Sequence, residues 1–333
     1  MAFGDQGLRP WTPPGPAAPD PVTTHPLDPA KFRESGLTAR GERRAWVALS
    51  GLRTLWFNTG SLCNIACGRC YIESSPTDDR LAFLTAAEVG GYLDEIARDG
   101  LPTREIGFTG GEPFVNRELP EMLRLCLARG FQVLVLTNAL RPLTNRRTAL
   151  LGLPAADRRR LVLRVSLDHY TAAVHDQERG PGTFALALEG LVWLARSGFP
   201  VHVAGRSFSG EDQASLRRGY ARLFAVHDLA IDAADPAALV LFPEMDVRLD
   251  VPEITESCWG ILGRSPESVM CASSRMVVKR RGAGHPTVVA CTLLPYDTRF
   301  ELGATLAEAA VSVPLNHPHC ARFCVLGGGA CSR

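Results

Sequence analysis

The sequence contains no apolar run that approaches the length of a membrane-spanning helix. It also carries almost no excess charge: its formal net charge is +1, so electrostatics does not favour nucleic acid or a membrane surface as a partner. Near the amino terminus, Asp5 and several prolines occupy positions where a secretory signal peptide would need an apolar segment. We therefore expect a cytoplasmic protein that binds neither nucleic acid nor a membrane.

Helix-forming sequence is also lacking at the start of the chain, where eight prolines fall between Pro10 and Pro29. Proline fixes its backbone φ angle and has no amide hydrogen, so such a stretch forms neither a helix nor a central strand. We expect residues 1–45 to be a proline-rich extension that is partly disordered. The hydrophobic content of the whole sequence, 46%, is sufficient for a sizeable core in the remaining chain.

From about residue 50, short apolar runs alternate with helical patterns. A capping box at Thr85 and Glu88 starts one helix, and apolar residues at helical spacing mark others around residues 119–127, 184–194 and 216–226. The apolar runs predict strands at residues 52–57, 106–108, 133–136, 161–167, 201–204 and 239–242. Such alternation is typical of parallel strands joined by right-handed helical crossovers. The sequence therefore predicts an α/β fold in which residues 46–245 form a partial, TIM-like (β/α)6 barrel, with its active site at the carboxyl ends of the strands.

Ten cysteines in a sequence without a secretion signal favour metal or cluster ligation over disulfide bonds. Three of them closely follow the first predicted strand, at Cys63, Cys67 and Cys70. Cys126 lies on the apolar stripe of a predicted helix, so we interpret it as a packed core thiol. The other six fall within residues 258–331, where helical periodicity weakens, and they predict a small cysteine-rich module at residues 246–333.

The spacing of Cys63, Cys67 and Cys70 suits a loop that turns three thiolates toward one point, as an iron–sulfur cluster requires. Three protein ligands for a four-iron cluster leave one iron open to a substrate or cofactor. The same spacing also places three side chains on one face of a helix, which would make them core cysteines. Asn64 and Gly68 disfavour that helix, and the apolar face that it would need is missing.

At these residues the sequence resembles the radical S-adenosylmethionine (SAM) superfamily, whose signature is C-x3-C-x2-C. The resemblance implies a [4Fe–4S] cluster on Cys63, Cys67 and Cys70 whose fourth iron chelates SAM. It also implies reductive cleavage of SAM to a 5′-deoxyadenosyl radical that abstracts a hydrogen atom from substrate, and a low-potential electron donor such as flavodoxin or ferredoxin. Arg69 stands where members usually carry an aromatic residue or histidine, and its guanidinium can stack on adenine. We count Arg69 and Tyr71 among the residues expected to contact the cofactor.

Gly110, Gly111, Glu112 and Pro113 follow the second predicted strand, where a barrel enzyme places catalytic residues. Two glycines let a ligand approach the backbone closely, and Glu112 offers a carboxylate. Alone, such a sequence would most often be a plain turn. Its position on the strand after the cysteine loop matches the GGEP motif of the superfamily, and the resemblance implies that it binds the amino group of SAM.

Polar residues also end the later predicted strands. Ser166 and Asp168 stand where the superfamily often places residues on the SAM ribose, and Arg206 offers a bidentate partner for the SAM carboxylate. Asn138, after the third strand, is placed to face cofactor or substrate. Structural roles as caps, turn residues or surface ion pairs are the alternatives for these residues.

In the C-terminal module, Cys271 and Cys291 bracket a hairpin-like segment, and Cys320, Cys324 and Cys331 follow it. The arrangement resembles the auxiliary-cluster modules called SPASM and twitch. It departs from them in having C-x3-C in place of the paired C-x2-C, and in having six cysteines where the full SPASM module uses seven. The resemblance implies an auxiliary [4Fe–4S] cluster on Cys271, Cys291, Cys320 and Cys324, with Cys331 as the substitute for one of them.

A structural zinc ion is the main alternative occupant of these cysteines, because tetrahedral thiolate sites suit zinc equally well. His317 and His319 flank Cys320 and are further candidate ligands, although histidines beside prolines in a loop usually have no such role.

Cys258 is a spare thiol just beyond the last predicted barrel strand. A free cysteine near a substrate radical can donate a hydrogen atom, as in radical SAM epimerases, and our hypothesis assigns this role to Cys258. The alternative is a buried apolar thiol, because free cysteine is among the most buried residue types.

Together these features predict an enzyme that applies SAM-derived radical chemistry to an organic substrate. The extension is too proline-rich to be a peptide-recognition domain, so we expect a small-molecule substrate, with a peptide as the alternative. Dehydrogenation, epimerisation, decarboxylation and coupling are the candidate reactions. The alternative from another class is a non-catalytic iron–sulfur or zinc protein, which would have no need of residues 110–113 at the adjacent strand end.

Overall fold

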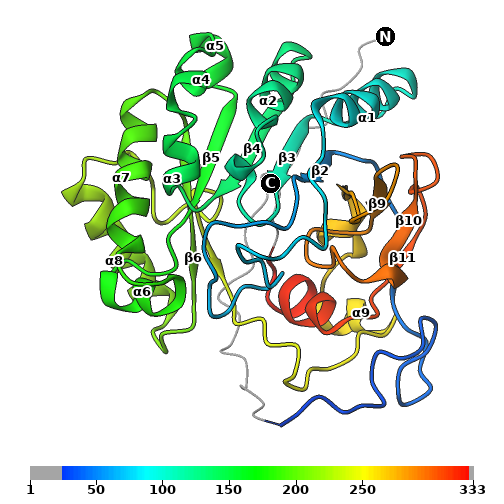
Figure 1. The fold of residues 1–333 in the computed structure, drawn as a ribbon. Helices are drawn as coiled ribbons and strands as arrows, with labels where there is room; N and C mark the ends of the chain where they lie inside the picture. The colour runs from blue at the N-terminus through cyan, green and yellow to red at the C-terminus, as the bar shows by residue number, and fades with distance from the viewer. Residues whose placement is uncertain (1–24, 330–333) are drawn as a thin grey trace, which may run out of the picture.

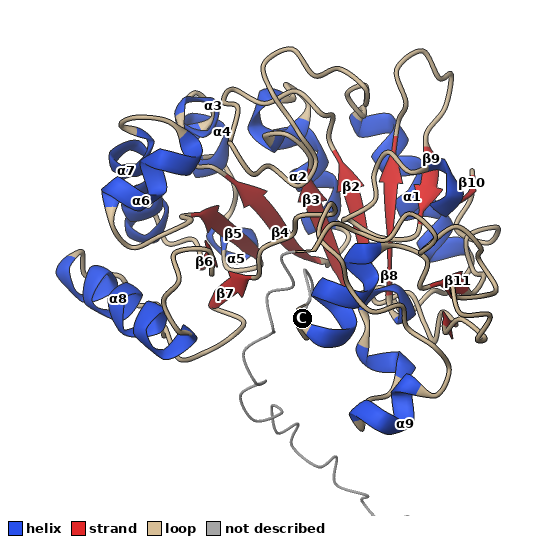
Figure 2. Ribbon diagram, turned by 90° about the horizontal axis from the view of Figure 1, so that it is seen from below, coloured by secondary structure: helices blue, strands red, loops and turns tan. Residues whose placement is uncertain are grey.

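The computed structural model describes residues 25–329, so the first 24 residues of the chain and Cys331 lie outside the described part. Within this range, six strands pair in parallel and in chain order, which confirms the predicted α/β fold and partial barrel. They are β2 (Thr54–Asn58), β3 (Glu105–Thr109), β4 (Gln132–Thr137), β5 (Leu161–Ser166), β6 (Val201–Arg206) and β7 (Leu239–Phe242). Figure 2 shows them as an open arc.

Helices cover the outer side of this arc, as α2, α7 and α8 show in Figure 2. The longer ones are α1 (Ala86–Arg98), α2 (Leu119–Ala128), α7 (Thr183–Arg196) and α8 (Gln213–Val226). The predicted capping box begins α1, because the Thr85 side chain accepts from the Glu88 amide and the Glu88 carboxylate accepts from the Thr85 amide. Among residues 25–329, no helix is both long and apolar enough to cross a membrane.

Four short helices complete the outer layer. They are α3 (Arg141–Thr144), α4 (Arg147–Leu151) and α5 (Ala155–Arg158) between β4 and β5, and α6 (Ala172–Arg179) after β5. Helical periodicity in the sequence did not predict α6. The reason is that α6 buries His175 and Glu178 and has no apolar stripe. The absence of an apolar stripe made this helix hard to predict, although its last residue, Arg179, lines the cavity at the carboxyl ends of the strands.

Each central strand separates two hydrophobic cores, because side chains alternate between the two faces of a strand. On β4, Val133 and Val135 belong to the core beneath the helices, whereas Leu134 belongs to the core inside the arc. Cys126 is fully buried in the outer core, in agreement with its interpretation as a packed thiol. Trp56 fills the inner side of β2.

The cysteine-rich module continues the sheet of the barrel. β8 (Ser274–Val278) pairs in parallel with β2, and β9 (Thr287–Val289) and β10 (Glu301–Gly303) follow as antiparallel strands. The described residues thus contain one sheet of nine strands, and β8 with β9 forms the predicted hairpin. Without β8, β2 would be an edge strand with open N–H and C=O groups. The sheet therefore continues from the barrel into the module across our proposed boundary at residue 245.

The rest of the module packs beneath the arc. It contains α9 (Cys258–Leu262) and a π-helical segment, Cys320–Leu326. Phe323 of this segment stacks on Phe242 of β7, with ring centroids 5.5 Å apart. The module therefore contacts both ends of the parallel series, β2 through β8 and β7 through Phe323.

Residues 25–45, which we call the N-terminal strap, lie against this module. The Arg44 side chain is fully buried, forms an ion pair with Glu253 at 2.5 Å and donates to the Leu315 carbonyl at 3.3 Å. Lys31 pairs with Asp250 at 2.8 Å. Directly after the strap, β1 (Trp46–Val47) pairs with β11 (Val313–Pro314). The described part of the extension thus packs against the C-terminal module, and the proline content of the sequence did not predict this contact.

Candidate active site

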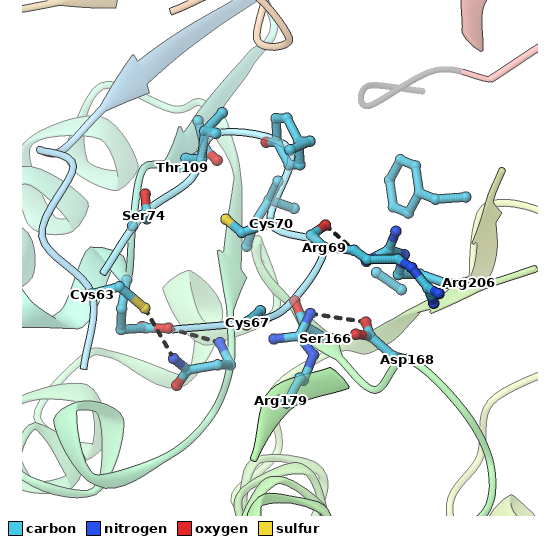
Figure 3. Close-up of a pocket in the computed structure, with 18 of the residues that line it drawn as sticks. Cys63, Cys67, Arg69, Cys70, Ser74, Thr109, Ser166, Asp168, Arg179 and Arg206 are labelled. Atoms are coloured by element: carbon cyan, nitrogen blue, oxygen red, sulfur yellow. Dashed lines mark hydrogen bonds and ion pairs between the residues drawn. The ribbon is translucent and has the colours of Figure 1, made fainter. Parts of the chain in front are cut away.

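A cavity opens at the carboxyl ends of the parallel strands, where barrel enzymes place their chemistry. Its walls come from the loop after β2, from the ends of β3 to β7 and from the C-terminal module. Figure 3 shows the cysteines of the loop on one side and Asp168, Arg179 and Arg206 on the other. Thiols, carboxylates and guanidinium groups from distant parts of the chain therefore face one space.

Cys63, Cys67 and Cys70 all line this cavity. Residues 61–71 form an irregular loop without helix, so the alternative that their spacing marks a helix face does not describe this segment. Backbone hydrogen bonds hold the loop: the Cys63 amide donates to the Ser75 carbonyl at 3.0 Å, and the Gly68 amide donates to the Glu178 carbonyl at 2.8 Å.

Cys63 is buried in this loop, and Cys67 and Cys70 are half-buried. Burial raises the pKa of Cys63 to about 12 and also raises the pKa of Cys67, and the neighbouring thiols add to both shifts. Three thiolates in such a place need a compensating positive charge, which coordinated iron supplies. The donor set therefore fits a [4Fe–4S] cluster, as the signature implies.

The two glycines after β3 are required because this turn packs directly against the cysteine loop. Gly110 has a φ of +139°, and a Cβ there would lie 2.6 Å from the Gly60 carbonyl oxygen. A Cβ on Gly111 would overlap the carbonyl oxygens of Ser61 and Leu62. Only glycine fits both positions, and the cysteine loop and the Gly110–Pro113 turn are consequently fixed relative to each other.

Glu112 is buried in the wall of the cavity. Its carboxylate accepts hydrogen bonds from Thr137 Oγ1 at 2.8 Å, from the Asn138 amide at 2.7 Å and from the Phe114 amide at 3.2 Å. Burial raises the pKa of Glu112 to about 7, although these hydrogen bonds act in the opposite direction. All three donors are neutral, and the charge of Arg179 also lowers this pKa, so a ligand cation beside Glu112 would further favour its ionised form.

Asn138 connects this turn to the cysteine loop. Its side-chain nitrogen donates to Asn64 Oδ1 at 2.9 Å and lies 3.8 Å from Cys63 Sγ. Asn138 therefore lines the cavity, and its side-chain amide lies beside the sulfur of Cys63, a candidate cluster ligand.

The structure also brings Ser166, Asp168 and Arg206 to the cavity, as predicted. Asp168 forms an ion pair with Arg179 at 2.9 Å. Burial alone would raise the pKa of Asp168, but Arg179 and Arg206 hold it below its usual value. Arg206 donates to the Arg69 carbonyl at 2.9 Å, so it also braces the cysteine loop.

Arg69 and Tyr71 line the mouth of the cavity. The Arg69 guanidinium forms an ion pair with Glu178 at 2.8 Å and lies over the Phe208 ring at 5.1 Å. The cation that we predicted to stack on adenine is thus directed toward a carboxylate and an aromatic ring of the chain itself. Tyr71 has an exposed fraction of 39% at the rim.

Sequence reasoning missed two arginines of the cavity wall, Arg164 and Arg179. Arg164 interrupts an otherwise apolar run in β5, and its position on the face shared with Ser166 was a signal that could have identified it. Arg179 ends α6, a helix that the sequence did not predict, so no signal of comparable strength pointed to it.

The four cysteines that we assigned to an auxiliary cluster line a second cavity, inside the C-terminal module. The hairpin of β8 and β9 brings Cys271 and Cys291 together, and the π-helical segment carries Cys320 and Cys324. Burial raises the pKa of Cys271 to about 11, and it raises that of Cys320 well above the usual value, with Cys291 adding to the effect. Cys331, our substitute ligand, lies outside the described residues.

His319 lines the same second cavity and is 4% exposed, whereas His317 is not among the residues of its wall. Burial lowers the pKa of His319 to about 4, so its imidazole is neutral at physiological pH. A neutral imidazole is the form that ligates metals, and His319 therefore stays a candidate neighbour of an occupied site.

Cys258 lines neither cavity. It begins α9, where its sulfur lies 3.3 Å from Thr255 Oγ1 and 3.4 Å from the Thr255 amide. The structure thus places Cys258 outside the walls of both cavities and gives no support to the hydrogen-donor hypothesis for Cys258, which stays a prediction.

Residues 57–212 match the family model described as the Radical SAM superfamily. The antilisterial bacteriocin subtilosin biosynthesis protein AlbA of Bacillus subtilis (strain 168) is 30% identical over 177 residues, which are 53% of this chain and 35% of AlbA. The mycofactocin maturase MftC of Mycobacterium ulcerans (strain Agy99) is 32% identical over 137 residues, 41% of this chain and 35% of MftC. The chain thus spans about a third of the length of these curated relatives.

Solved structures share the fold at low sequence identity. Streptococcus suis SuiB bound to S-adenosylmethionine aligns with a TM-score of 0.56 at 11% identity, over 77% of this chain and 64% of SuiB. Native anSMEcpe with bound AdoMet aligns with a TM-score of 0.52 at 13% identity, over 77% of this chain and 79% of that chain. The matched family model agrees with the partial barrel and with the cysteine signature, so residues 57–212 of this chain carry the features of the radical SAM superfamily.

Proposed function

We propose that this chain is an enzyme that binds a [4Fe–4S] cluster on Cys63, Cys67 and Cys70, cleaves SAM reductively and abstracts a hydrogen atom from an organic substrate. One observation carries the proposal: the cysteine loop and the Gly110–Pro113 turn are packed against each other and line the same cavity. A plain iron–sulfur or zinc protein has no need for the second of these elements beside the first.

Within this proposal, the chain's own residues bind and orient. Glu112 accepts a hydrogen bond from the SAM ammonium. The positive charge of that group lowers the pKa of Glu112 from about 7, so that its carboxylate is ionised when SAM is bound. Arg206 pairs with the SAM carboxylate, and Ser166 and Asp168 contact the ribose. Asn138 holds the position of Cys63 through its side-chain amide. When bound, the cluster and SAM supply the 5′-deoxyadenosyl radical.

A radical site needs protection from water and from side reactions. Apolar side chains also line the cavity, and they come from the cysteine loop, from the barrel and from the C-terminal module: Ile65, Leu136, Phe242, Met245 and Leu293. We assign them to the exclusion of water from the substrate.

The second cavity, in this proposal, holds an auxiliary [4Fe–4S] cluster on Cys271, Cys291, Cys320 and Cys324. The connection of these cysteines to a radical SAM barrel supports the cluster, and a structural zinc ion is the alternative because tetrahedral thiolate sites suit zinc equally well.

For the substrate we propose an organic molecule, which is either a small molecule or a peptide. The names of two relatives favour a peptide, because one is a bacteriocin biosynthesis protein and the other a maturase. The electron donor is a flavodoxin or ferredoxin.

The test is anaerobic reconstitution with iron and sulfide, followed by calorimetry with SAM and by detection of 5′-deoxyadenosine after reduction with dithionite. We expect SAM to bind and 5′-deoxyadenosine to form. A reconstituted protein that carries a cluster but neither binds nor cleaves SAM would establish the non-catalytic alternative.

A further inference from the structure

The strand β8 carries a fully buried arginine. Arg275 is 1% exposed, and its guanidinium donates hydrogen bonds to backbone carbonyls. The acceptors are the carbonyls of Cys271 at 2.6 Å, Ser274 at 2.8 Å, Val311 at 2.8 Å and Ala309 at 3.0 Å. Carbonyl oxygens satisfy these N–H groups but carry no net charge. The positive charge of Arg275 therefore remains inside the C-terminal module.

Arg275 has no carboxylate partner among the described residues. The groups that act on its charge there are the thiols of Cys271 and Cys291. Arg44, which is equally buried, differs because it forms an ion pair with Glu253 at 2.5 Å. A buried charge without a counter-charge is strongly destabilising, so Arg275 gains from a negative charge nearby.

The second cavity lies beside this guanidinium. Cys271, whose carbonyl accepts from Arg275 Nη1, lines that cavity together with Cys291. Burial raises the pKa of Cys271 to about 11, and the positive charge of Arg275 acts in the opposite direction. Burial likewise lowers the pKa of Arg275, and the thiolate charges of Cys271 and Cys291 act against that effect. The guanidinium is thus within electrostatic range of two of the four proposed ligands.

Two other arginines near the second cavity are already neutralised. Arg44 and Arg299 both interact electrostatically with a third proposed ligand, Cys320. Arg44 pairs with Glu253, and Arg299 pairs with Asp297 at 2.6 Å. Neither ion pair adds a net charge to the site. The buried cation of β8 has no such partner in the part of the chain that the structure describes.

The auxiliary cluster of the proposed function would be net negative, because four thiolates carry more negative charge than a [4Fe–4S] core carries positive charge. One-electron reduction adds a further negative charge. We propose that Arg275 is the counter-cation of this cluster, so that its fixed charge compensates the four-thiolate site and favours the reduced state. The inference rests on the proposed function of the second cavity. It makes Arg275 a positioning residue that raises the reduction potential of the cluster through its charge.

The experiment measures the reduction potential of the second site alone. The full chain carries Cys63→Ala, Cys67→Ala and Cys70→Ala, which remove the first cluster, and it is reconstituted anaerobically with iron and sulfide. Titration with dithionite, followed by the electron paramagnetic resonance signal of the reduced cluster, gives the midpoint potential. Iron analysis and circular dichroism report the metal content and the fold.

Two substitutions separate the charge from the hydrogen bonds. Arg275→Gln removes the charge and Arg275→Lys keeps it, whereas both lose most of the hydrogen bonds to carbonyls. We expect Arg275→Gln to shift the reduction equilibrium roughly tenfold toward the oxidised cluster, which corresponds to about 59 mV for one electron. Arg275→Lys, the matched control, should keep most of the wild-type potential.

Equal potentials of wild type and Arg275→Gln would overturn the inference. Equal shifts in the two variants would also overturn it, because the lost hydrogen bonds would then explain them. If Arg275→Gln does not fold or does not retain iron, Arg275→Lys decides the question alone: a near-wild-type potential supports the inference, and a large fall in potential or a loss of iron overturns it.

In all these cases the proposed auxiliary cluster stands as long as the chain with wild-type Arg275 binds iron at the second site. A second site without iron contradicts the proposed auxiliary cluster itself, and the inference fails with it.

Discussion

The two cysteine sites of this protein are assembled in different ways. Cys63, Cys67 and Cys70 lie on one loop between β2 and α1, and a few backbone hydrogen bonds give that loop its shape. The cysteines of the second cavity come from the two sides of a hairpin and from a π-helical segment. The first site is a local motif on a finished barrel, whereas the second exists only when distant segments have packed.

This difference predicts different consequences of metal loss. The strands beneath the cysteine loop are held by the sheet and by the outer core, neither of which includes the loop cysteines as packing residues. In contrast, Cys271 and Cys320 belong to the inner core of the C-terminal module. We expect the first site to lose its metal without unfolding and the second to lose structure together with its metal.

The largest effect should come from replacing Cys63, Cys67 and Cys70 with Ala together. We expect the reconstituted protein to lose about four irons per chain, if the cluster is of the [4Fe–4S] type, and all cleavage of SAM. Iron analysis and 5′-deoxyadenosine formation measure the loss. The circular dichroism spectrum and the thermal midpoint should stay close to wild type. Unchanged iron content would contradict the assignment.

Replacing Cys320 with Ser should remove the metal of the second cavity and lower the thermal midpoint. The expected loss is again about four irons for a [4Fe–4S] cluster, measured by plasma mass spectrometry, which also detects zinc. Cys126→Ser is the matched control, because Cys126 is a buried core thiol away from both cavities. A loss of zinc in place of iron would show that the second site is a zinc site.

The strap offers a way to separate the two sites. Arg44→Met leaves Glu253 buried without its cation, which costs about 3–5 kcal/mol when a buried pair is broken on one side. Because the strap contacts the C-terminal module, we expect a chelator to remove the second metal faster in this variant and the first at the wild-type rate. Equal acceleration at both sites would show that the strap stabilises the whole molecule.

This prediction has a pH dependence. Burial alone would raise the pKa of Glu253, but hydrogen bonds from the Ala39 amide and Arg44 lower it below the usual value. The stabilisation is therefore fully present above the unfolded-state pKa of a glutamate, about 4.3, and is lost as the pH falls through the folded-state pKa. The stability difference between Arg44→Met and wild type, measured by denaturant unfolding, should shrink in acid.

The smallest effect concerns the coupling of the cysteine loop to its neighbouring turn. Glu112→Gln should weaken SAM binding by about 1.5–3 kcal/mol, the value of a charge-assisted hydrogen bond. Iron content should stay the same, because the side chain does not ligate the cluster in our proposal. SAM affinity equal to wild type, measured by calorimetry, would make residues 110–113 a structural turn only.

The local motifs and the parallel strands of the barrel could be predicted from the sequence, but the pairing of the C-terminal module with the barrel could not. The cysteine loop, the turn at Glu112 and the capping box at Thr85 each depend on residues close together in the chain, and the structure shows them where they were expected. The pairing of β8 with β2 joins residues far apart in the chain, and hydrophobic periodicity does not encode the partner of a strand.

The two missed arginines have separate physical reasons. Arg164 is a charge inside an apolar strand, and a buried position for it follows only from knowing which face of β5 points into the barrel. Arg179 reaches the cavity because α6 buries polar residues, an arrangement that overrides the usual apolar pattern of a helix. In both cases a functional side chain breaks the local rule that secondary-structure prediction relies on.

The pairing of β1 with β11 has a consequence for biosynthesis. Trp46 pairs with Pro314, so the strand that follows the strap has no partner until the chain up to residue 314 has left the ribosome. The same holds for the edge of β2, which waits for β8. The parallel strands from β2 to β7 can pair during translation. The strap and the last strands pair afterwards, because their contacts join residues far apart in the sequence. A nascent chain stalled before residue 274 should therefore present an open β2 edge, and with it the risk of association with other chains, until synthesis resumes.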